Sequence, residues 1–269
     1  MRPARTAGVG PRAGKGELDT KKIVALLGSK RRANTYGLLT QIRKLLAEKD
    51  MELEIIELYQ YDVQDCCGCE ACVLRGSCVL RDDVARIREE IAAADGVILA
   101  SPVYLQQVSG KMKTFFDRTC SWYHRPVLTA KPVLCVATTK GSGLRATLSY
   151  LENIAAQWGA IPAGTVGRTI FNLQKPVGER ELARFERLIA APQTASPTLK
   201  QLIGFEVQKS LSQYLNGLDG EYWREKGWDS RPYFCPCRIN PFKRAISGAV
   251  GAAMRRGMAR GQRHTGSGR

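Results

Sequence analysis

Four closely spaced cysteines carry the clearest chemical signal in this chain. Their spacing is C-x2-C-x2-C-x5-C, and they are Cys66, Cys69, Cys72 and Cys78. Iron–sulfur clusters are held by four cysteine thiolates with short gaps between them. A structural zinc ion usually takes two widely separated C-x2-C pairs or adds histidines, and His124 and His264 lie far from these cysteines. We therefore interpret the four thiols as ligands of a [4Fe–4S] cluster, with zinc ligands or uncoordinated thiols as the alternatives.

The remaining cysteines are less informative. Cys67 directly follows the first of the four, and the even spacing favours the first as the ligand. Cys120 and Cys135 fall in a predicted helix and a predicted strand, where buried, inert thiols are common. Cys235 and Cys237 could chelate a metal or react, but a C-x-C pair alone is a weak signal.

The composition indicates a globular protein with two cationic ends. The chain has 269 residues and a net charge of +16, of which residues 17–229 carry only +3. A nucleic-acid-binding domain usually carries its charge on a folded face, so we expect no nucleic acid partner. No apolar run reaches the length of a membrane span, and the basic start of the chain lacks the apolar segment of a secretory signal. We therefore expect a cytoplasmic protein, in which nine cysteines indicate metal or redox chemistry rather than disulfides.

Short apolar runs that alternate with helix-like stretches indicate an α/β fold. Five runs have the character of buried parallel strands: residues 23–27, 53–58, 97–100, 133–137 and, more weakly, 161–166. Helices are expected at residues 34–48, 83–93, 109–120 and 143–157. The strands recur at the interval of a strand–helix–strand unit. This pattern predicts an open, doubly wound, five-stranded parallel sheet.

Ligands of such sheets bind at the carboxyl ends of the strands, and the loops there carry suitable residues. The first strand leads into the polar and basic loop 28–35, which could bind a phosphate at the helix start or could be a helix capped by Asn34 or Thr35. The third strand leads into Ser-Pro-Val-Tyr at residues 101–104, and the fourth leads into the glycine-containing loop 138–143. Because the cysteine loop follows the second strand, we expect the cluster and a phosphate-bearing cofactor to be neighbours.

These motifs resemble the iron–sulfur flavoprotein branch of the flavodoxin-like, NADPH-dependent FMN reductase superfamily. The phosphate loop of that family is similar to Gly28-Ser29-x-Arg31 with Asn34-Thr35. Its flavin-ring loop and the next helix resemble Ser101-Pro102-Val103-Tyr104, Lys111-Met112-Lys113 and Phe116-Asp117-Arg118. Its compact cluster motif matches Cys66 to Cys78 followed by Asp82-Asp83. The resemblance spans about residues 21 to 170 and implies a flavodoxin-like fold, bound FMN, a [4Fe–4S] cluster, and a homo-oligomer with cofactors near subunit contacts.

The resemblance also implies residue roles in FMN binding. The phosphate would be held by Ser29, Arg31, Asn34 and Thr35. The isoalloxazine ring would be flanked by Pro102, Val103 and Tyr104 and bordered by Thr138, Lys140, Gly141 and Ser142. The chain departs from the family pattern at Lys30, where proline is usual, and at Leu105-Gln106-Gln107, which replaces a glycine-containing segment.

An FMN-dependent oxidoreductase that couples one- and two-electron steps is the function that the resemblance implies. A small ferredoxin-like protein or NAD(P)H is the expected redox partner. No catalytic acid, base or nucleophile is evident: Asp82 and Asp83 are expected to begin a helix, and His124 to be a packed or surface histidine rather than a residue beside the flavin. A cluster-free NAD(P)H-dependent FMN or quinone reductase and a zinc-stabilised, non-catalytic binding module remain as alternatives.

The pattern changes after residue 190, so we divide the chain into three parts. We expect a disordered basic segment at 1–20, an FMN-binding domain at 21–190 with the cysteine loop 66–78, and a helical extension with a basic tail at 191–269. Within the extension, residues 198–215 indicate a helix and residues 232–241 an irregular segment. One face of a further helix would carry Phe242, Ile246, Ala249, Val250 and Ala253. We expect that helix to pack on its own subunit or on an oligomer mate, with an anionic membrane surface or an acidic redox partner as the alternatives.

Overall fold

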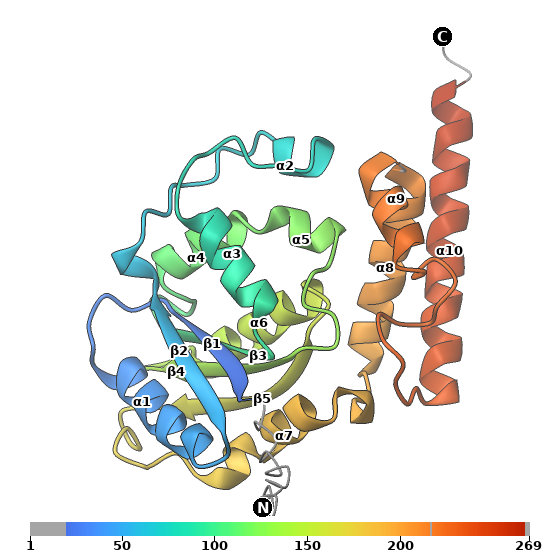
Figure 1. Cartoon of the computed structure of the whole chain (residues 1–269). Coiled ribbons are helices and arrows are strands. Elements are labelled where there is room, and N and C mark those ends of the chain that lie inside the picture. The colour runs from blue at the N-terminus through green and yellow to red at the C-terminus, as the bar shows by residue number, and fades with distance from the viewer. Residues whose placement is uncertain (1–19, 216, 267–269) are drawn as a thin grey trace, which may run out of the picture.

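A five-stranded parallel sheet forms the centre of the computed structural model, which describes residues 20–215 and 217–266 (Figure 1). The strand order is β2-β1-β3-β4-β5. The strands are β1 (Lys21–Leu27), β2 (Met51–Glu57), β3 (Gly96–Pro102), β4 (Pro132–Thr138) and β5 (Ile161–Arg168). All neighbouring strands pair in parallel. This is the strand order of the flavodoxin-like doubly wound fold, so the predicted fold class is confirmed.

Helices cover both faces of the sheet. The sheet region contains α1 (Asn34–Ala47), α2 (Ala71–Leu74), α3 (Val84–Ala93), α4 (Gly110–Asp117), α5 (Cys120–His124), α6 (Leu144–Gln157) and α7 (Glu179–Ala190), with the 3₁₀ turns η1 (Leu58–Gln60) and η2 (Pro192–Thr194). Side chains of α1 and α7 fill the core on one face, and those of α3, α4 and α6 fill the core on the other. Because both faces are covered, every residue of β4 is buried.

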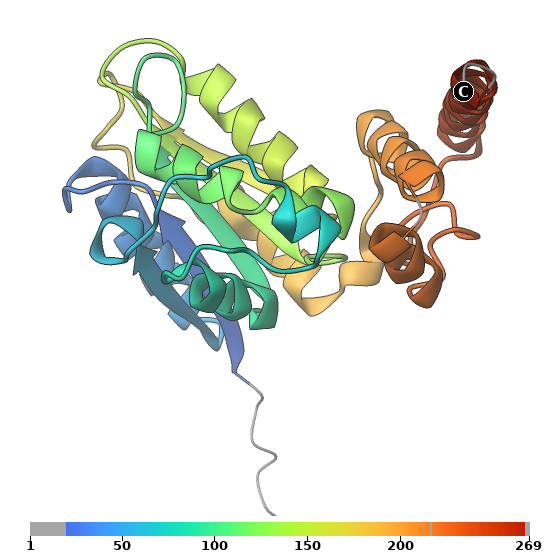
Figure 2. The same ribbon diagram turned by 90° about the horizontal axis from the view of Figure 1, so that it is seen from above.

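A helical extension follows the sheet domain, as predicted. It consists of α8 (Leu199–Leu215), α9 (Gly217–Glu225) and α10 (Pro241–Gly266), which lie to one side of the sheet (Figure 2). An aromatic core of its own holds the extension together, formed by Leu202, Phe205, Trp223, Trp228, Tyr233 and Phe234. The segment between α9 and α10 has no regular structure, in agreement with the prediction for residues 232–241. The basic segment predicted at 1–20 lies, apart from residue 20, outside the described residues.

The helix predicted at residues 109–120 is broken in two. Ser109 caps α4 by accepting a hydrogen bond from the Met112 N–H at 3.3 Å. The break follows Asp117, where the Thr119 hydroxyl donates to the Phe116 carbonyl at 2.7 Å and accepts from the Trp158 indole at 3.1 Å. Such side chain-to-backbone bonds compete with the helix ladder. Cys120 is therefore an exposed residue at the start of α5 and not the buried helix thiol that we expected, whereas Cys135 is buried as expected.

Helix α10 packs on α8 through small residues rather than through its apolar stripe. Ser247 and Gly251 are buried, whereas Phe242 is 74% exposed and Val250 is 37% exposed. The two helices approach so closely that a Cβ at Gly251 would collide with the Glu206 carboxylate. The helix therefore packs on its own chain, but through a face other than the predicted one. No helix in the described parts of the chain is long and apolar enough to cross a membrane.

Candidate functional site

The loops at the carboxyl ends of β1, β3 and β4 enclose a cavity of about 190 Å³. Nine residues that the sequence pointed to line it: Ser29, Arg31, Asn34, Thr35, Pro102, Val103, Tyr104, Thr138 and Lys140. A second, 470 Å³ cavity is lined by Val103 and Lys140 as well, and also by Gly141 and Ser142. The structure thus brings all eleven of these residues together around two cavities that share one edge.

Hydrogen bonds between the loops fix the shape of this edge. The hydroxyls of Thr35 and Thr138 are 2.7 Å apart and both are buried, so the start of α1 is joined to the end of β4. The Val103 N–H donates to the Thr138 carbonyl at 2.8 Å, which joins the ends of β3 and β4. Three segments that are far apart in the sequence are therefore held in one arrangement at the rim of the sheet.

The first turn of α1 is open toward an anion. Ala33 occupies the cap position, no side chain caps the helix, and its first turn contains no acidic residue. Asn34 and Thr35 lie inside the helix, so the alternative in which one of them is the cap is wrong. Ser29 lies beside this turn with its hydroxyl bonded to the Arg31 carbonyl at 2.8 Å. Free N–H groups, the helix dipole and the exposed Arg31 guanidinium together suit a phosphate.

A tight turn forms the outer wall of the second cavity. Tyr104 and Gln107 exchange backbone hydrogen bonds of 2.8 and 3.1 Å, and Leu105 and Gln106 between them have φ values of +46° and +71°. The Gln106 amide donates to the Ser142 hydroxyl at 2.7 Å, so the turn is tied to the loop after β4. Tyr104 is 47% exposed and Leu105 is fully exposed. A planar group entering here would meet aromatic and apolar surface, which suits a flavin ring.

The cysteine loop follows β2 and η1 and crosses α4 and α5 (Figure 1). Its start is held by α4 and the residue after it: the Thr114 hydroxyl donates to Asp65 at 3.0 Å, and Arg118 donates to the Gln64 carbonyl at 2.8 Å. A small cavity of about 20 Å³ is lined by Cys66, Cys67, Cys69, Cys72 and Cys78. Among the residues that the structure describes, no three His, Cys, Asp or Glu side chains are arranged to hold a metal ion. The loop therefore gathers the predicted ligands around one cavity without forming a closed site.

The surroundings of Cys69 favour its thiolate form. A hydrogen bond from the Ala71 N–H, followed by contact with the Cys67 thiol, lowers the pKa of Cys69. Gly68, Glu70 and Gly76 have positive φ values, so the backbone turns repeatedly along the loop. A lowered pKa is typical of a thiol that binds metal or reacts. A set of free thiols around one cavity, with nearby cationic and backbone N–H donors, is chemically suited to an iron–sulfur cluster.

Arg118 and Asp82 form a buried ion pair beside Cys78. Their side chains are 2% and 1% exposed, and Arg118 Nη2 lies 3.0 Å from Asp82 Oδ1. The same Nη2 is 3.5 Å from Cys78 Sγ. Burial alone would lower the pKa of Arg118, but its bonds to Asp82 and Cys78 outweigh burial and raise it. A permanent positive charge therefore faces the sulfur of one predicted ligand, and this role of Arg118 was not predicted.

A second polar cluster connects the extension to the cysteine loop. Asp219 in α9 is 4% exposed, pairs with Arg125, and is hydrogen-bonded to His124 Nδ1 at 2.9 Å. Arg125 also donates to the carbonyls of Cys72 and Val73. His124 is thus a packed histidine, as expected, and it lines neither cavity at the sheet rim. Asp82 accepts a hydrogen bond from the Val84 N–H, and Asp83 occupies the N-cap position of α3 without a side-chain capping bond, so both lie at the start of that helix, as expected.

The cysteine cavity and the cavities at the sheet rim share no lining residue. The cysteine loop runs over α4 and α5 toward α9 (Figure 1). The two sites that we expected to be neighbours therefore form separate cavities within one chain. The physical reason is the length of the loop after β2, which carries the cysteines away from the strand end.

Comparison with known proteins assigns this chain to a protein family. A family model described as NADPH-dependent FMN reductase matches residues 21–172. An iron–sulfur flavoprotein of Archaeoglobus fulgidus is 31% identical over 223 residues, which cover 77% of this chain and 99% of the relative. An iron–sulfur flavoprotein of Methanocaldococcus jannaschii is 37% identical over 99 residues, which cover 36% of this chain and 51% of the relative.

Two further matches come from reductases. A quinone reductase of Escherichia coli strain K12 is 30% identical over 126 residues, which cover 45% of this chain and 61% of the relative. The apo structure of the NADH:FMN oxidoreductase EMOB is 20% identical with a TM-score of 0.46, over 64% of this chain and 88% of that one. From the family match and the nearly full-length A. fulgidus relative, the chain belongs to the NADPH-dependent FMN reductase family of FMN-dependent oxidoreductases, in the branch of the iron–sulfur flavoproteins.

Proposed function

We propose that this chain is an oxidoreductase that binds FMN at the sheet rim and a [4Fe–4S] cluster in the cysteine loop. The observation that carries the proposal is the gathering of Cys66, Cys69, Cys72 and Cys78 around one cavity, with Arg118 beside Cys78. The family match and the names of the relatives support it. When bound, FMN supplies two-electron chemistry and the cluster supplies one-electron transfer.

At the sheet rim, the residues of this chain bind and orient the flavin. Arg31, Ser29 and the free N–H groups of the first turn of α1 would hold the phosphate. Pro102, Val103 and Tyr104 would lie against one side of the ring. The loop of Thr138, Lys140, Gly141 and Ser142 would border the ring on the other side, held by the bonds from Thr35 and Gln106.

In the cysteine loop, the residues of this chain hold the cluster and set its surroundings. Both Cys66 and Cys67 line the cavity, and the spacing argument favours Cys66 as the ligand. The cationic Arg118 stabilises negative charge on the sulfur of Cys78, and in general such N–H···S bonds tune the reduction potential of iron–sulfur clusters. Asp82 keeps Arg118 in place.

The FMN site and the cysteine loop line separate cavities, and the family resemblance implies a homo-oligomer with cofactors near subunit contacts. We propose that the rim residues of one subunit would hold FMN near the cysteine loop of another, where bound FMN would supply two-electron chemistry and a bound cluster one-electron transfer. NAD(P)H is the proposed two-electron donor and a small ferredoxin-like protein the proposed one-electron partner.

Two alternatives make different predictions for the purified protein. A cluster-free quinone reductase is favoured by the match to the E. coli enzyme and would be yellow and free of iron. A zinc-stabilised binding module would be colourless and contain zinc. Anaerobically purified protein that contains iron, acid-labile sulfide and FMN supports the proposal, and protein that lacks both sulfide and FMN refutes it.

Two substitutions assign the sites. Cys69→Ala is expected to abolish cluster assembly and to leave FMN bound, whereas Cys120→Ala, which removes an exposed thiol outside the loop, is expected to leave the iron content unchanged. Arg31→Ala is expected to weaken FMN binding roughly 10- to 100-fold through loss of a charge-assisted phosphate contact. Arg43→Ala, an exposed substitution on α1, is the control. Wild-type iron content in Cys69→Ala, or wild-type FMN affinity in Arg31→Ala, would contradict the respective assignment.

A further inference from the structure

Two cysteines of the helical extension line neither the rim cavities nor the cavity of the cysteine loop. Cys235 and Cys237 lie in the irregular segment between α9 and α10, where a single proline separates them. Their side chains are hydrogen-bonded to each other, and both are partly buried against the aromatic core of the extension. Two thiols in contact can do chemistry that one cannot, because the second can complete a disulfide that the first begins.

The fold holds this segment at both ends. On one side, the indole N–H of the buried Trp228 donates to the Phe234 carbonyl at 3.0 Å. On the other side, the Asn240 side chain caps α10 by accepting hydrogen bonds of 2.9 and 3.3 Å from two N–H groups at the start of that helix. Between these points, the ring of Pro236 restricts the backbone. The segment has therefore already lost much of the freedom that joining the two sulfurs would cost.

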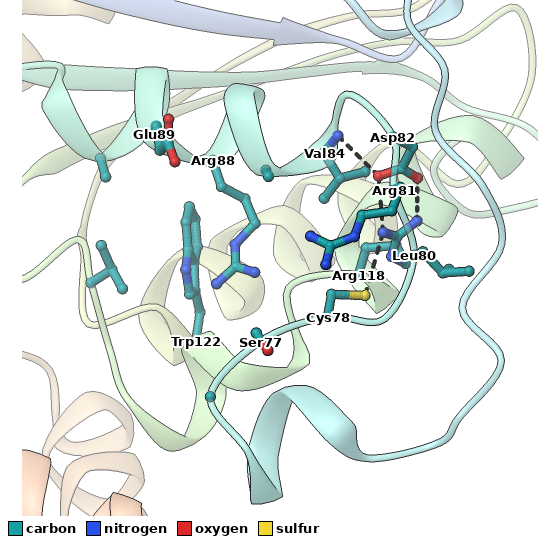
Figure 3. A pocket seen from close by; sticks show the side chains of 14 residues that line it. Ser77, Cys78, Leu80, Arg81, Asp82, Val84, Arg88, Glu89, Arg118 and Trp122 are labelled. Carbon is teal, nitrogen blue, oxygen red and sulfur yellow. Dashed lines mark hydrogen bonds and ion pairs between the residues drawn. The ribbon is translucent and has the colours of Figure 1, made fainter.

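The contact makes the two thiols unequal. The hydrogen bond from the Cys235 thiol outweighs burial and lowers the pKa of Cys237, whereas the same contact, together with burial, raises the pKa of Cys235. Cys237 is thus the first of the two to form a thiolate, which is the form that attacks a disulfide. In the cysteine loop, by contrast, the sulfur of Cys78 has the cationic Arg118 beside it (Figure 3). In the extension, the partner of each sulfur is another thiol.

The surroundings of the pair favour a bond between its own sulfurs over a metal. A structural zinc ion takes four ligands, of which the pair supplies two. The core beside the pair is apolar and includes Tyr233 and Phe234, both buried. Pro236 and Arg238 are exposed, so a small reagent in water can reach the pair. The charge of Arg238, next to Cys237 in the chain, would attract an anionic reagent.

We propose that Cys235 and Cys237 form a redox-active dithiol, which reacts with small disulfides of the glutathione type and becomes an internal disulfide. In the first step, the Cys237 thiolate attacks one sulfur of the small disulfide, so a mixed disulfide forms and a small thiolate leaves. In the second step, Cys235 gives its proton to that thiolate and attacks Sγ of Cys237. The bond between Cys235 and Cys237 forms, and the second small thiolate leaves and takes up the proton that Cys237 had lost. Two electrons and two protons thereby pass from the protein to the small disulfide, which becomes two thiols.

Mass spectrometry of the full-length, anaerobically purified holoprotein tests the proposal. The protein is incubated with an excess of oxidised glutathione, its free thiols are blocked with N-ethylmaleimide, and it is digested with trypsin. Because proline follows Arg231, trypsin leaves that bond intact, and the pair falls on one peptide, residues 227–238, which contains no other cysteine. We expect most of this peptide to carry an internal disulfide, and to carry two maleimide groups when the protein is reduced with dithiothreitol before blocking.

Single substitutions separate the roles of the two thiols. Cys235→Ser is expected to stop the reaction at the mixed disulfide, so that glutathione remains on Cys237. Cys237→Ser is expected to react with oxidised glutathione about tenfold more slowly or less, because burial of the remaining thiol keeps its thiolate scarce. Cys120→Ser removes an exposed thiol elsewhere in the chain and is the control, in which the peptide should be oxidised as in the wild type.

The wild-type protein alone can overturn the proposal, so the test stands even where a substituted protein fails to fold. A peptide that keeps both thiols free in oxidised glutathione would do so, as would a peptide that carries glutathione on both cysteines without an internal disulfide. A Cys237→Ser protein that reacts at the wild-type rate would overturn the order of attack. The iron, sulfide and FMN contents of the same preparation test the proposed function separately, because the dithiol chemistry requires neither cofactor.

Discussion

Asp219 offers a direct test of how the helical extension supports the cysteine loop. Asp219 is 4% exposed, and its carboxylate forms an ion pair with Arg125 and a hydrogen bond with His124. Arg125 in turn donates to the carbonyls of Cys72 and Val73. Asp219→Asn preserves the shape of the side chain and one acceptor oxygen but removes the charge. We expect this change to loosen the contact between α9 and the loop.

The magnitude follows from the contacts that remain. Breaking a buried ion pair by removing one partner costs about 3–5 kcal/mol. Because Arg125 retains two carbonyl acceptors and the asparagine oxygen can still accept one bond, we expect a smaller effect than that, about 2–3 kcal/mol in the free energy of unfolding. Since each 1.4 kcal/mol changes an equilibrium constant by a factor of ten, the ratio of unfolded to folded protein should rise roughly 30- to 150-fold.

Urea unfolding followed by tryptophan fluorescence measures this effect. Trp223 in α9 is 1% exposed and donates to the His124 carbonyl at 2.8 Å, so it reports on the same contact. Asp229→Asn, an exposed change in the same extension, is the matched control and should leave the unfolding curve unchanged. If the protein binds the proposed cluster, Asp219→Asn should also lose iron to a chelator faster. An Asp219→Asn curve that coincides with the control would refute the reasoning.

Two further predictions concern acid stability and a glycine at the sheet rim. Burial alone would raise the pKa of Asp82, but hydrogen bonds from Arg118 and from two backbone N–H groups outweigh burial and lower it. The contribution of this pair to stability is therefore complete above the unfolded-state pKa, at about pH 4, and is lost as the pH falls through the lower folded-state value. Asp82→Asn should flatten the acid limb of a curve of stability against pH, and an unaltered limb would contradict this. Gly143 has a φ of +87°, and a Cβ there would lie 2.7 Å from the Gln106 Cα. Gly143→Ala should lower the free energy of unfolding by about 2 kcal/mol or more, whereas Gly141→Ala, which meets open space, should change it little; equal effects in thermal unfolding would count against the argument.

The sheet was predictable because its burial leaves a local signature. A strand covered on both faces must be apolar along its whole length, as β4 is, so short apolar runs identify it without knowledge of the fold. The rim residues followed from the same logic, since parallel strands end at one edge. Ser29, Thr35, Pro102 and Thr138 accordingly lie around one cavity.

Features that depend on distant partners were not predictable. The break at Thr119 depends on its hydrogen bonds, one of them to Trp158, 39 residues away. The prediction of which face of α10 packs was wrong, because a close contact between helices uses small residues. Gly251 does not contribute to an apolar pattern in the sequence, so that pattern could not identify it. That the cysteine loop and the sheet rim form separate cavities was also not predicted, since it depends on the path of the loop over α4 and α5.

By itself, the sequence determined the fold class, the strand ends that form the rim, and the cysteines that are suited to bind iron. Each of these depends on residue type and on spacing within one short segment. Only the tertiary structure decided which charges meet those segments: Asp82 pairs with Arg118 across 36 positions, Arg125 with Asp219 across 94, and Arg88 has no carboxylate partner in the described residues. Ion pairs between distant positions leave no periodic pattern, because they depend on how the completed fold places the two side chains and how far it excludes water from them.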